Sequence, residues 1–180
     1  MRFGTEWAMP SRWTFEIPPI ADFVARWTTG ASMIVDPFCG RSMIGTHRND
    51  LAHDGVDAEE FCRGLLVRGS LADVVLFDPP YSPRQISECY KMVGRTTTME
   101  DTQSSFWGRT RRPLADLLKP GGVALSFGWQ SSGFGKEWDT LEILLVQHGG
   151  AHNDTICVAQ RKPTNLFQQK AATMATEASA

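Results

Sequence analysis

The sequence lacks cysteine motifs, long apolar runs and a signal peptide, which are features that often assign a protein to a class. No two of its cysteines form a C-x-x-C pair, which excludes a zinc knuckle or a dithiol redox motif of that spacing. The longest apolar runs, such as 74–77 and 143–146, are far too short to cross a membrane. Charged residues interrupt every apolar stretch near Met1, so no signal peptide is expected. Scattered reduced thiols in a cytoplasmic protein are the expectation that fits these absences.

An excess of positive charge is also lacking. The formal net charge is −2 at pH 7, whereas a nucleic-acid-binding domain usually has a basic surface. Basic residues are nevertheless enriched over 84–112, where Arg84, Lys91, Arg95, Arg109, Arg111 and Arg112 stand against Glu88, Glu100 and Asp101. This segment is either a local contact surface for nucleic acid or a solvated loop, and charge alone leaves both interpretations open.

Short apolar runs alternate with segments of helical periodicity along most of the chain. The patterns predict strands over 32–36, 44–48, 74–78, 123–127, 142–146 and 155–160, and helices over 20–27, 58–65, 85–93 and 114–118. Pro120-Gly121-Gly122 is expected to stop the last of these helices. Buried strands that alternate with helices predict an α/β fold, a sheet covered on both faces, in one domain over 1–164. The polar segment 165–180 has little to bury, so a disordered tail is predicted there.

Two of the predicted strands end in an acidic residue followed by proline. Asp36-Pro37 ends the first strand, and Asp78-Pro79 ends the most apolar one. Ligands of open α/β sheets bind outside the carboxyl ends of the strands. Both acids are therefore predicted to face the same crevice.

The segment Asp78-Pro79-Pro80-Tyr81 is the most specific signal in the chain. Each proline fixes φ and restricts the residue before it, so the pair predicts a stiff, extended segment. Proline has no N–H, and the carbonyls stay free to accept hydrogen bonds beside the Asp78 carboxylate and the Tyr81 ring. Such acceptors next to an aromatic ring suit a flipped-out base whose amino group must be held. The alternative is a strand-ending turn without a ligand.

These residues resemble the amino-methyltransferases of DNA, whose motif is Asp/Asn/Ser-Pro-Pro-Tyr/Phe and whose Asp form is usual in enzymes that methylate N6 of adenine. The stretch 13–162 is similar to small adenine methyltransferases encoded by phages and mobile elements. The resemblance implies a Rossmann-like class I methyltransferase fold of three layers, S-adenosylmethionine as cofactor, and double-stranded DNA with a flipped base as substrate. It also implies that Asp78 and the Pro79 carbonyl accept hydrogen bonds from the target amino group, that Pro80 stiffens the segment, and that Tyr81 stacks on the base.

The same resemblance implies a cofactor site. Residues 35–40 are similar to the family's cofactor loop, D-P-F-x-G-x-G, although Ser42 replaces the last glycine and the helix after the loop is expected to be shortened or lost. Asp50 and Asp57 would accept hydrogen bonds from the cofactor's ribose and adenine, but each is interpreted equally well as a helix cap. The implied cofactor-binding residues are Thr14, Phe15, Asp36, Pro37, Phe38, Gly40, Asp50, Asp57, Ala58 and Asp78.

Contacts with the substrate are expected after the second motif, where polar side chains, aromatic rings and arginines suit phosphates and bases. The residues predicted for this role are Ser82, Arg84, Ser104, Ser105, Phe106, Trp107 and Arg109. No metal is expected, because amino methylation needs none and the histidines at 148 and 152 fall in a turn between two strands. A separate recognition domain does not fit in 180 residues, so either a homodimer or loose sequence specificity is expected.

The interpretation that joins these patterns is a site-specific, adenine-N6 DNA methyltransferase of a bacterial or archaeal host or of its viruses, as in restriction–modification systems. A cytosine-N4 or an RNA adenine methyltransferase is an alternative, while Asp78 argues against a protein-amide enzyme. A non-catalytic protein that binds or depletes S-adenosylmethionine, as an anti-restriction factor does, is a further alternative, which the shortened cofactor loop favours.

Overall fold

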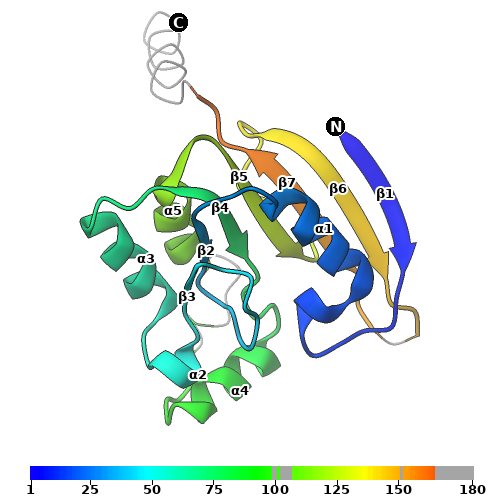
Figure 1. The fold of residues 1–180 in the computed structure, drawn as a ribbon. Coiled ribbons are helices and arrows are strands. Elements are labelled where there is room, and N and C mark those ends of the chain that lie inside the picture. The colour runs from blue at the N-terminus through cyan, green and yellow to red at the C-terminus, as the bar shows by residue number, and fades with distance from the viewer. Residues whose placement is uncertain (99–100, 102–106, 151, 165–180) are drawn as a thin grey trace, which may run out of the picture.

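The computed structural model describes residues 1–98, 101, 107–150 and 152–164. Within them, seven strands form one sheet in the order β1-β6-β7-β5-β4-β2-β3 (Figure 1). β7 is antiparallel to both β5 and β6, whereas all other neighbours are parallel. The strands are β1 (Arg2–Trp7), β2 (Ile34–Asp36), β3 (His47–Arg48), β4 (Ala72–Phe77), β5 (Leu118–Gly128), β6 (Asp139–Gln147) and β7 (Thr155–Arg161).

The helices follow the caps and periodicities of the sequence. α4 begins with Pro83 behind a capping box formed by Ser82 and Gln85. α1 begins at Pro18 and buries Phe23 and its neighbours at helical spacing. The helices are α1 (Pro18–Thr28), α2 (Leu51–Asp54), α3 (Ala58–Val67), α4 (Pro83–Met92) and α5 (Gly108–Leu117), with a 3-10 turn η1 (Thr14–Glu16).

The core is divided between the two faces of the sheet. On β4, Val74 and Leu76 belong to a buried cluster with residues of α1, while Val75 and Phe77 belong to a second cluster with residues of α3 and α5. Full burial of such side chains stabilises the fold by about 2 kcal/mol each. Helices on both faces of a mostly parallel sheet confirm the predicted α/β fold class with its three layers.

The connection from β2 to β3 contains no helix. Residues 37–46 form turns and irregular backbone, so the expected loss of the helix after this loop is confirmed. β3 is correspondingly short, with two residues rather than the five predicted over 44–48. The loop instead folds across the carboxyl ends of the strands, which brings it into the site described below.

Other expectations from the sequence are also wrong. β1 was not predicted, because it is an edge strand whose side chains are nearly all exposed. α5 begins at Gly108 instead of residue 114, and its Pro113 lies inside the helix. Pro120-Gly121-Gly122 does not stop a helix but lies within β5, at a register shift against β4. Gly121 has φ +79°, and a Cβ on Gly122 would lie 2.9 Å from Leu118 Cγ, so only glycines fit this irregularity.

Among the described residues, none of the helices combines the length and the apolar character that a membrane span requires. The predicted tail, 165–180, lies outside the described residues.

Candidate active site

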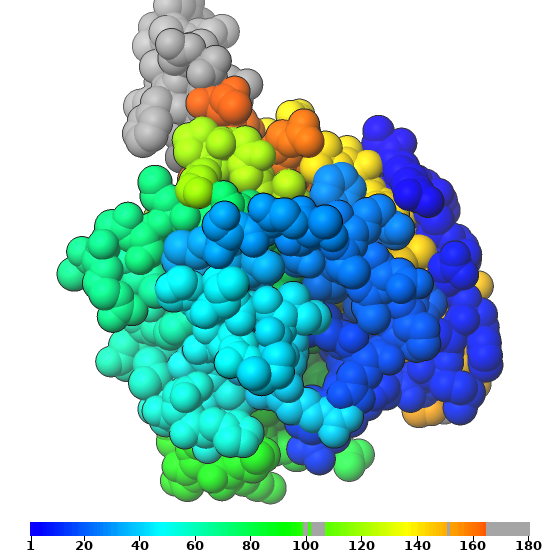
Figure 2. All heavy atoms as spheres, viewed as in Figure 1, coloured from blue at the N-terminus to red at the C-terminus, as the bar shows by residue number. Residues whose placement is uncertain are grey.

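A cleft of about 940 Å³ lies at the carboxyl ends of β2 and β4. Its walls come from the N-terminal segment 10–17, the loop 37–44, the start of α2 and α3, the segment 78–81 after β4, and the β6–β7 connection. Figure 2 shows green atoms from the middle of the chain in the hollow between cyan atoms of the loop and blue atoms of the N-terminal segment. The volume is in the usual range for a small-ligand site, about 300–1,000 Å³.

The segment Asp78–Tyr81 forms part of the floor of this cleft. This segment directly follows the buried strand β4. The capping box of α4 fixes its other end, because Gln85 Oε1 accepts a hydrogen bond from the Tyr81 N–H at 2.9 Å. The Tyr81 hydroxyl donates to Asp78 Oδ1 at 3.0 Å. All four residues of the motif line the cleft, so the strongest sequence signal lies in this cavity.

Burial determines the protonation of both polar groups of this motif. It raises the pKa of Asp78 to about 6, against hydrogen bonds from the hydroxyls of Thr14 and Tyr81 that lower it. Burial, followed by the charge of Asp78, raises the pKa of the Tyr81 phenol well above its ordinary value. At neutral pH the pair is therefore an ionised carboxylate that accepts from a neutral phenol.

Two residues beside Tyr81 were not predicted. A Cβ on Gly128, at the end of β5, would lie 2.7 Å from Tyr81 Cε1, so the ring needs a glycine there. The next residue, Trp129, is 50% exposed, and its ring centroid is 6.3 Å from that of Tyr81. A tryptophan directly after a buried strand was the only signal in the sequence, and it became meaningful only once β5 and β4 were known to be neighbours.

Asp36 occupies a different environment from Asp78. It is fully buried, it does not line the cleft, and its Oδ1 accepts a hydrogen bond from the Phe38 N–H at 3.2 Å. Its Oδ2 has no hydrogen-bond partner among the described residues. Burial is the main cause that raises the pKa of Asp36 to about 7, and the charge of Asp78 raises it further. Of the two acids predicted to face one crevice, the structure places only Asp78 there.

The loop after β2 is covered by the N-terminal segment. Gly40, at φ +51°, lies against the Trp13 ring, and a Cβ there would come within 2.8 Å of Trp13 Cζ3. The Arg41 guanidinium lies 4.8 Å from the Trp13 ring centroid and forms an ion pair with Glu16. Gly40 is therefore required for contact with Trp13, independently of any ligand. Ser42, at the position of the missing glycine, lines the same cleft and accepts a hydrogen bond from the Ile44 N–H.

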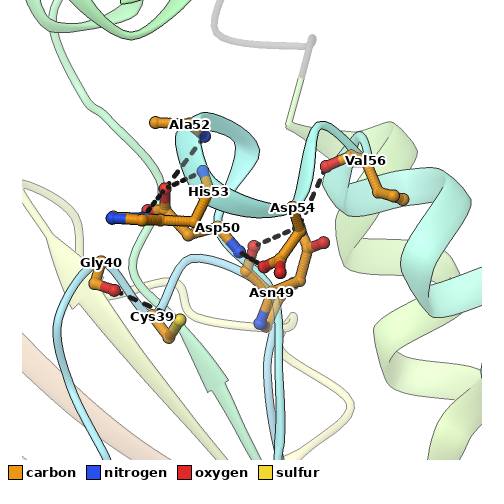
Figure 3. Close-up of polar contacts among 9 residues, drawn as sticks. Cys39, Gly40, Asn49, Asp50, Ala52, His53, Asp54 and Val56 are labelled. Atoms are coloured by element: carbon orange, nitrogen blue, oxygen red, sulfur yellow. Dashed lines mark hydrogen bonds and ion pairs between the residues drawn. The ribbon is translucent and has the colours of Figure 1, made fainter.

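Asp50 and Asp57 line the cleft and also cap helices, and Figure 3 shows the cap contacts of Asp50. Asp50 Oδ1 accepts from the backbone N–H groups of Ala52 and His53, at 2.9 and 3.2 Å. Asp57 Oδ1 accepts from the Glu59 N–H at 2.9 Å. The capping interpretation of both acids is thus confirmed, and the cap bonds engage the Oδ1 atom of each.

Asn49 was not predicted as a site residue. It organises the wall of the cleft that the loop after β2 and the start of α3 form. Its buried amide Nδ2 donates to the carbonyls of Val56, at 3.1 Å, and Pro37, at 3.4 Å. Its backbone also pairs with Asp36 and Cys39. Asn49 therefore ties the loop after β2 to the start of α3, a role that only the tertiary structure reveals.

The remaining predicted residues are distributed unevenly around the cleft. Thr14, Phe15, Pro37, Phe38, Ala58 and Trp107 line it, and the Trp107 ring lies edge-on to Phe38 at 5.3 Å. Ser82 caps α4, Arg84 pairs with Glu88 on the surface, and Arg109 pairs with Glu59. Ser104, Ser105 and Phe106 lie outside the described residues. Among the described residues no group of three His, Cys, Asp or Glu side chains is placed to hold a metal ion.

No protein-family model matches the sequence, and no curated protein is similar to it at a significant level. Similar folds are found among solved structures. The N-methyltransferase NodS from Bradyrhizobium japonicum WM9, in complex with S-adenosyl-L-homocysteine, is 13% identical over 90% of this chain and 78% of its own, with a TM-score of 0.44. TrmN from Thermus thermophilus is 16% identical over 81% of this chain and 49% of its own, with a TM-score of 0.45. At these identities and scores, the likenesses establish neither an activity nor a site for this chain.

Proposed function

We propose that this protein is an S-adenosylmethionine-dependent methyltransferase that methylates the exocyclic N6 amino group of adenine in double-stranded DNA. The observation that carries the proposal is the arrangement of Asp78, Pro79 and Tyr81 on the floor of the cleft, at the end of a buried strand. A carboxylate and a carbonyl that accept hydrogen bonds, next to an aromatic ring, match an amino group on a flat base.

The cleft residues fit the proposed cofactor. The caps engage Oδ1 of Asp50 and of Asp57, and we assign the second oxygen of each to the hydroxyl and amino groups of the cofactor's nucleoside. Phe38 and the backbone of Ala58 line the same wall and would enclose its adenine. When bound, S-adenosylmethionine supplies the electrophilic methyl group.

The chain itself holds and polarises the acceptor. Asp78, ionised above a pKa of about 6, and the Pro79 carbonyl would accept the two N–H bonds of the amino group and turn its nitrogen lone pair toward the cofactor side of the cleft. Fixed acceptors of this kind act through positioning and electrostatics, without a covalent intermediate.

Tyr81 has two tasks in this proposal. Its hydroxyl already donates to Asp78 Oδ1, which orients the carboxylate and leaves Oδ2 for the amino group. Its ring, braced by the glycine at 128 and near Trp129, would form one side of the slot for the base. Rigid support of both groups is what a base-binding site needs, since misplacement by about 1 Å lowers rates strongly.

A second candidate is a protein that binds or depletes S-adenosylmethionine without methylating nucleic acid. The observation in its favour is the loop 37–46, which has lost its helix and is covered by Trp13. A cofactor-binding protein of this kind has no use for Asp78 and Tyr81 at the floor of the cleft, so the two candidates differ in the effect of changing those residues.

Transfer of tritium from methyl-labelled S-adenosylmethionine to DNA, RNA and protein tests the proposal. We expect label in duplex DNA, and modified-base sequencing of that DNA should locate it at N6 of adenine. Asp78→Ala and Tyr81→Ala should abolish transfer while titration calorimetry shows cofactor binding retained. Label in RNA or at N4 of cytosine would replace the proposed acceptor. Cofactor binding with no transfer to any polymer would favour the second candidate.

A further inference from the structure

Exposed apolar side chains are concentrated at the start of the chain. Nine large hydrophobic residues are exposed in the described part of the structure, and four of them fall within the first nine residues. These are Met1, Phe3, Trp7 and Met9, each more than 60% exposed. Single exposed apolar residues are ordinary, whereas a contiguous group indicates a surface that another molecule covers.

Phe3 and Trp7 of this group lie on β1, at the edge of the sheet, and Met1 and Met9 flank that strand in the chain (Figure 1). β1 pairs with β6 on one side, and no described strand pairs with its other side. The dark-blue atoms of β1 run along the right-hand border of the molecule in Figure 2. An open edge strand offers unpaired N–H and C=O groups to another strand, and natural proteins usually protect such an edge with charges, prolines or a covering segment.

The apolar side of β1 continues onto the neighbouring strands. Phe3 and Trp7 are in register with Ile143 and Gln147 of β6, and side chains in register in a parallel pair share a face. Ile143 and Leu145 on this face are only half buried, whereas Leu144 and Val146 on the opposite face are buried in the cluster that contains α1. Residues 129–138 connect β5 to β6 and contain no helix. This connection therefore places no helix over this end of the sheet.

The sequence of β1 is complementary to itself in one antiparallel register. If two copies meet about a two-fold axis at Gly4, Arg2 lies opposite Glu6 of the other copy, and Glu6 lies opposite its Arg2. The same register places Phe3 beside Thr5 and Trp7 beside Met1. A shift by one or two residues in either direction separates both charge pairs. Opposite charges directly across a strand pair stabilise it, and a shift by one residue also exchanges the two faces.

We propose that β1 is the dimerisation strand, through which two copies of this chain join their sheets edge to edge in the antiparallel register centred on Gly4. The interface is isologous, because each strand contributes the same residues to its partner. It closes the open edge, pairs Arg2 with Glu6 twice, and brings the exposed Phe3 and Trp7 of both copies together. The inference does not depend on the proposed function, and its test needs neither cofactor nor nucleic acid.

Sedimentation equilibrium of the full chain tests the proposal first. We expect a mass of twice 20.0 kDa. Trp7→Glu places an unpaired charge on the interface and should weaken dimerisation at least tenfold. The matched control is Val67→Glu on α3, which adds the same charge at a site that is 90% exposed and remote in the fold. The control should leave the dimer unchanged, and circular dichroism should show that both variants are folded.

Disulfide trapping tests the register without depending on a destabilising variant. The two copies of Gly4 lie directly opposite each other, at the Cα separation of about 4.5–5.5 Å that an antiparallel pair provides and a disulfide accepts. Gly4→Cys should therefore form a covalent dimer on oxidation. Thr5→Cys should not, because the two copies of residue 5 are two positions out of register. The wild-type chain, with its four cysteines, is oxidised in parallel.

A monomer at all concentrations, or a larger open assembly, would overturn the proposal. A dimer that survives Trp7→Glu and is not trapped at position 4 would also overturn it, because the copies would then meet elsewhere.

Discussion

Two strands of this protein end in the same Asp-Pro dipeptide, and the two aspartates have different roles. Asp36, the last residue of β2, is fully buried outside the cleft, while Asp78, directly after β4, lines the cleft. Both carboxyls have a pKa raised mainly by burial, to about 7 and about 6 respectively. The dipeptide and its place at a strand end therefore do not decide whether the acid is available to a ligand.

The residue two positions further along the chain accounts for the difference. Phe38 has a backbone N–H, which donates to Asp36 Oδ1 and folds that carboxylate back onto its own turn. The corresponding residue after Asp78 is Pro80, which has no N–H to donate. Asp78 is consequently left to the hydroxyls of Thr14 and Tyr81 and to any donor in the cleft. The second proline thus keeps Asp78 free of a local turn.

Replacing Asp36 and Asp78 each by asparagine should give the largest difference between the two sites, measured as the rate of methyl transfer. Asp78→Asn removes the charge that is proposed to hold the amino group, and we expect methyl transfer to fall roughly 100- to 1,000-fold, as for loss of a single preorganised hydrogen-bonding group in other enzymes. Asp36→Asn leaves the cleft surface unchanged and should alter the rate less than about tenfold. Single-turnover transfer of labelled methyl groups to DNA measures both.

Cofactor affinity is the control for this pair, and both variants should retain it within a few-fold by calorimetry. Equal losses of transfer in the two variants would mean that the aspartates act as one unit and that the distinction drawn between them is wrong.

The free energy of unfolding should rise in Asp36→Asn, whereas the rate of methyl transfer should fall in Asp78→Asn. Asp36 is buried, and its pKa of about 7 lies above the ordinary 3.8, so the folded state binds the proton more tightly and loses stability as pH rises between these values. The shift corresponds to about 4 kcal/mol at most. Asp36→Asn is neutral at every pH, so its free energy of unfolding should exceed that of the wild type by several times more at pH 8 than at pH 4. Urea unfolding at the two pH values measures this difference.

A stabilising effect of Asp36→Asn that does not vary with pH would show that the carboxylate finds a partner when ionised. The unpaired Oδ2 of Asp36 argues against such a partner among the described residues.

Most of the fold followed from local pattern, and the exceptions have identifiable causes. α3, β4 and the β6–β7 pair were predicted because their apolar residues repeat with one period and end at clear signals. β1 was missed because its partner, β6, is more than 130 residues away in the chain. Residues 120–122 were expected to stop a helix because Pro-Gly-Gly is typical of a turn. In the structure they lie within β5, at an irregularity in its pairing with β4.

The candidate site was predicted where it depends on one motif, and missed where it depends on packing between elements. Asp78 and Tyr81 were found because Pro-Pro constrains the chain locally. Gly128 and Asn49 carry no local signal, since one accommodates a ring and the other joins two loops only in the folded chain. The burial of Asp36 was likewise invisible, because it depends on how the loop 37–46 folds back.

Replacing each proline by alanine tests whether Pro80 accounts for the difference between Asp36 and Asp78. Pro80→Ala restores an N–H two residues after Asp78, so a turn like that at Asp36 becomes available and should compete with the amino group. We expect a loss of about fivefold in the rate of transfer, the size expected when one hydrogen bond of about 1 kcal/mol competes for the group. Pro79→Ala is the matched control, because it relieves the same stiffness but adds its N–H one residue too early. It should lower the rate by less.

The pH dependence of transfer should show a single acid limb that belongs to Asp78. With a pKa of about 6, half of the Asp78 carboxyls are ionised at pH 6, and the rate should fall to half its plateau there and to about one tenth at pH 5. Acid unfolding would not explain this loss, because a raised carboxyl pKa means that protonation of this group favours the folded state. The limb should persist in Asp36→Asn and disappear from the residual activity of Asp78→Asn. If it is instead lost with Asp36, whose pKa is about 7, the buried acid rather than the cleft acid controls the reaction, and the roles of the two Asp-Pro turns must be exchanged.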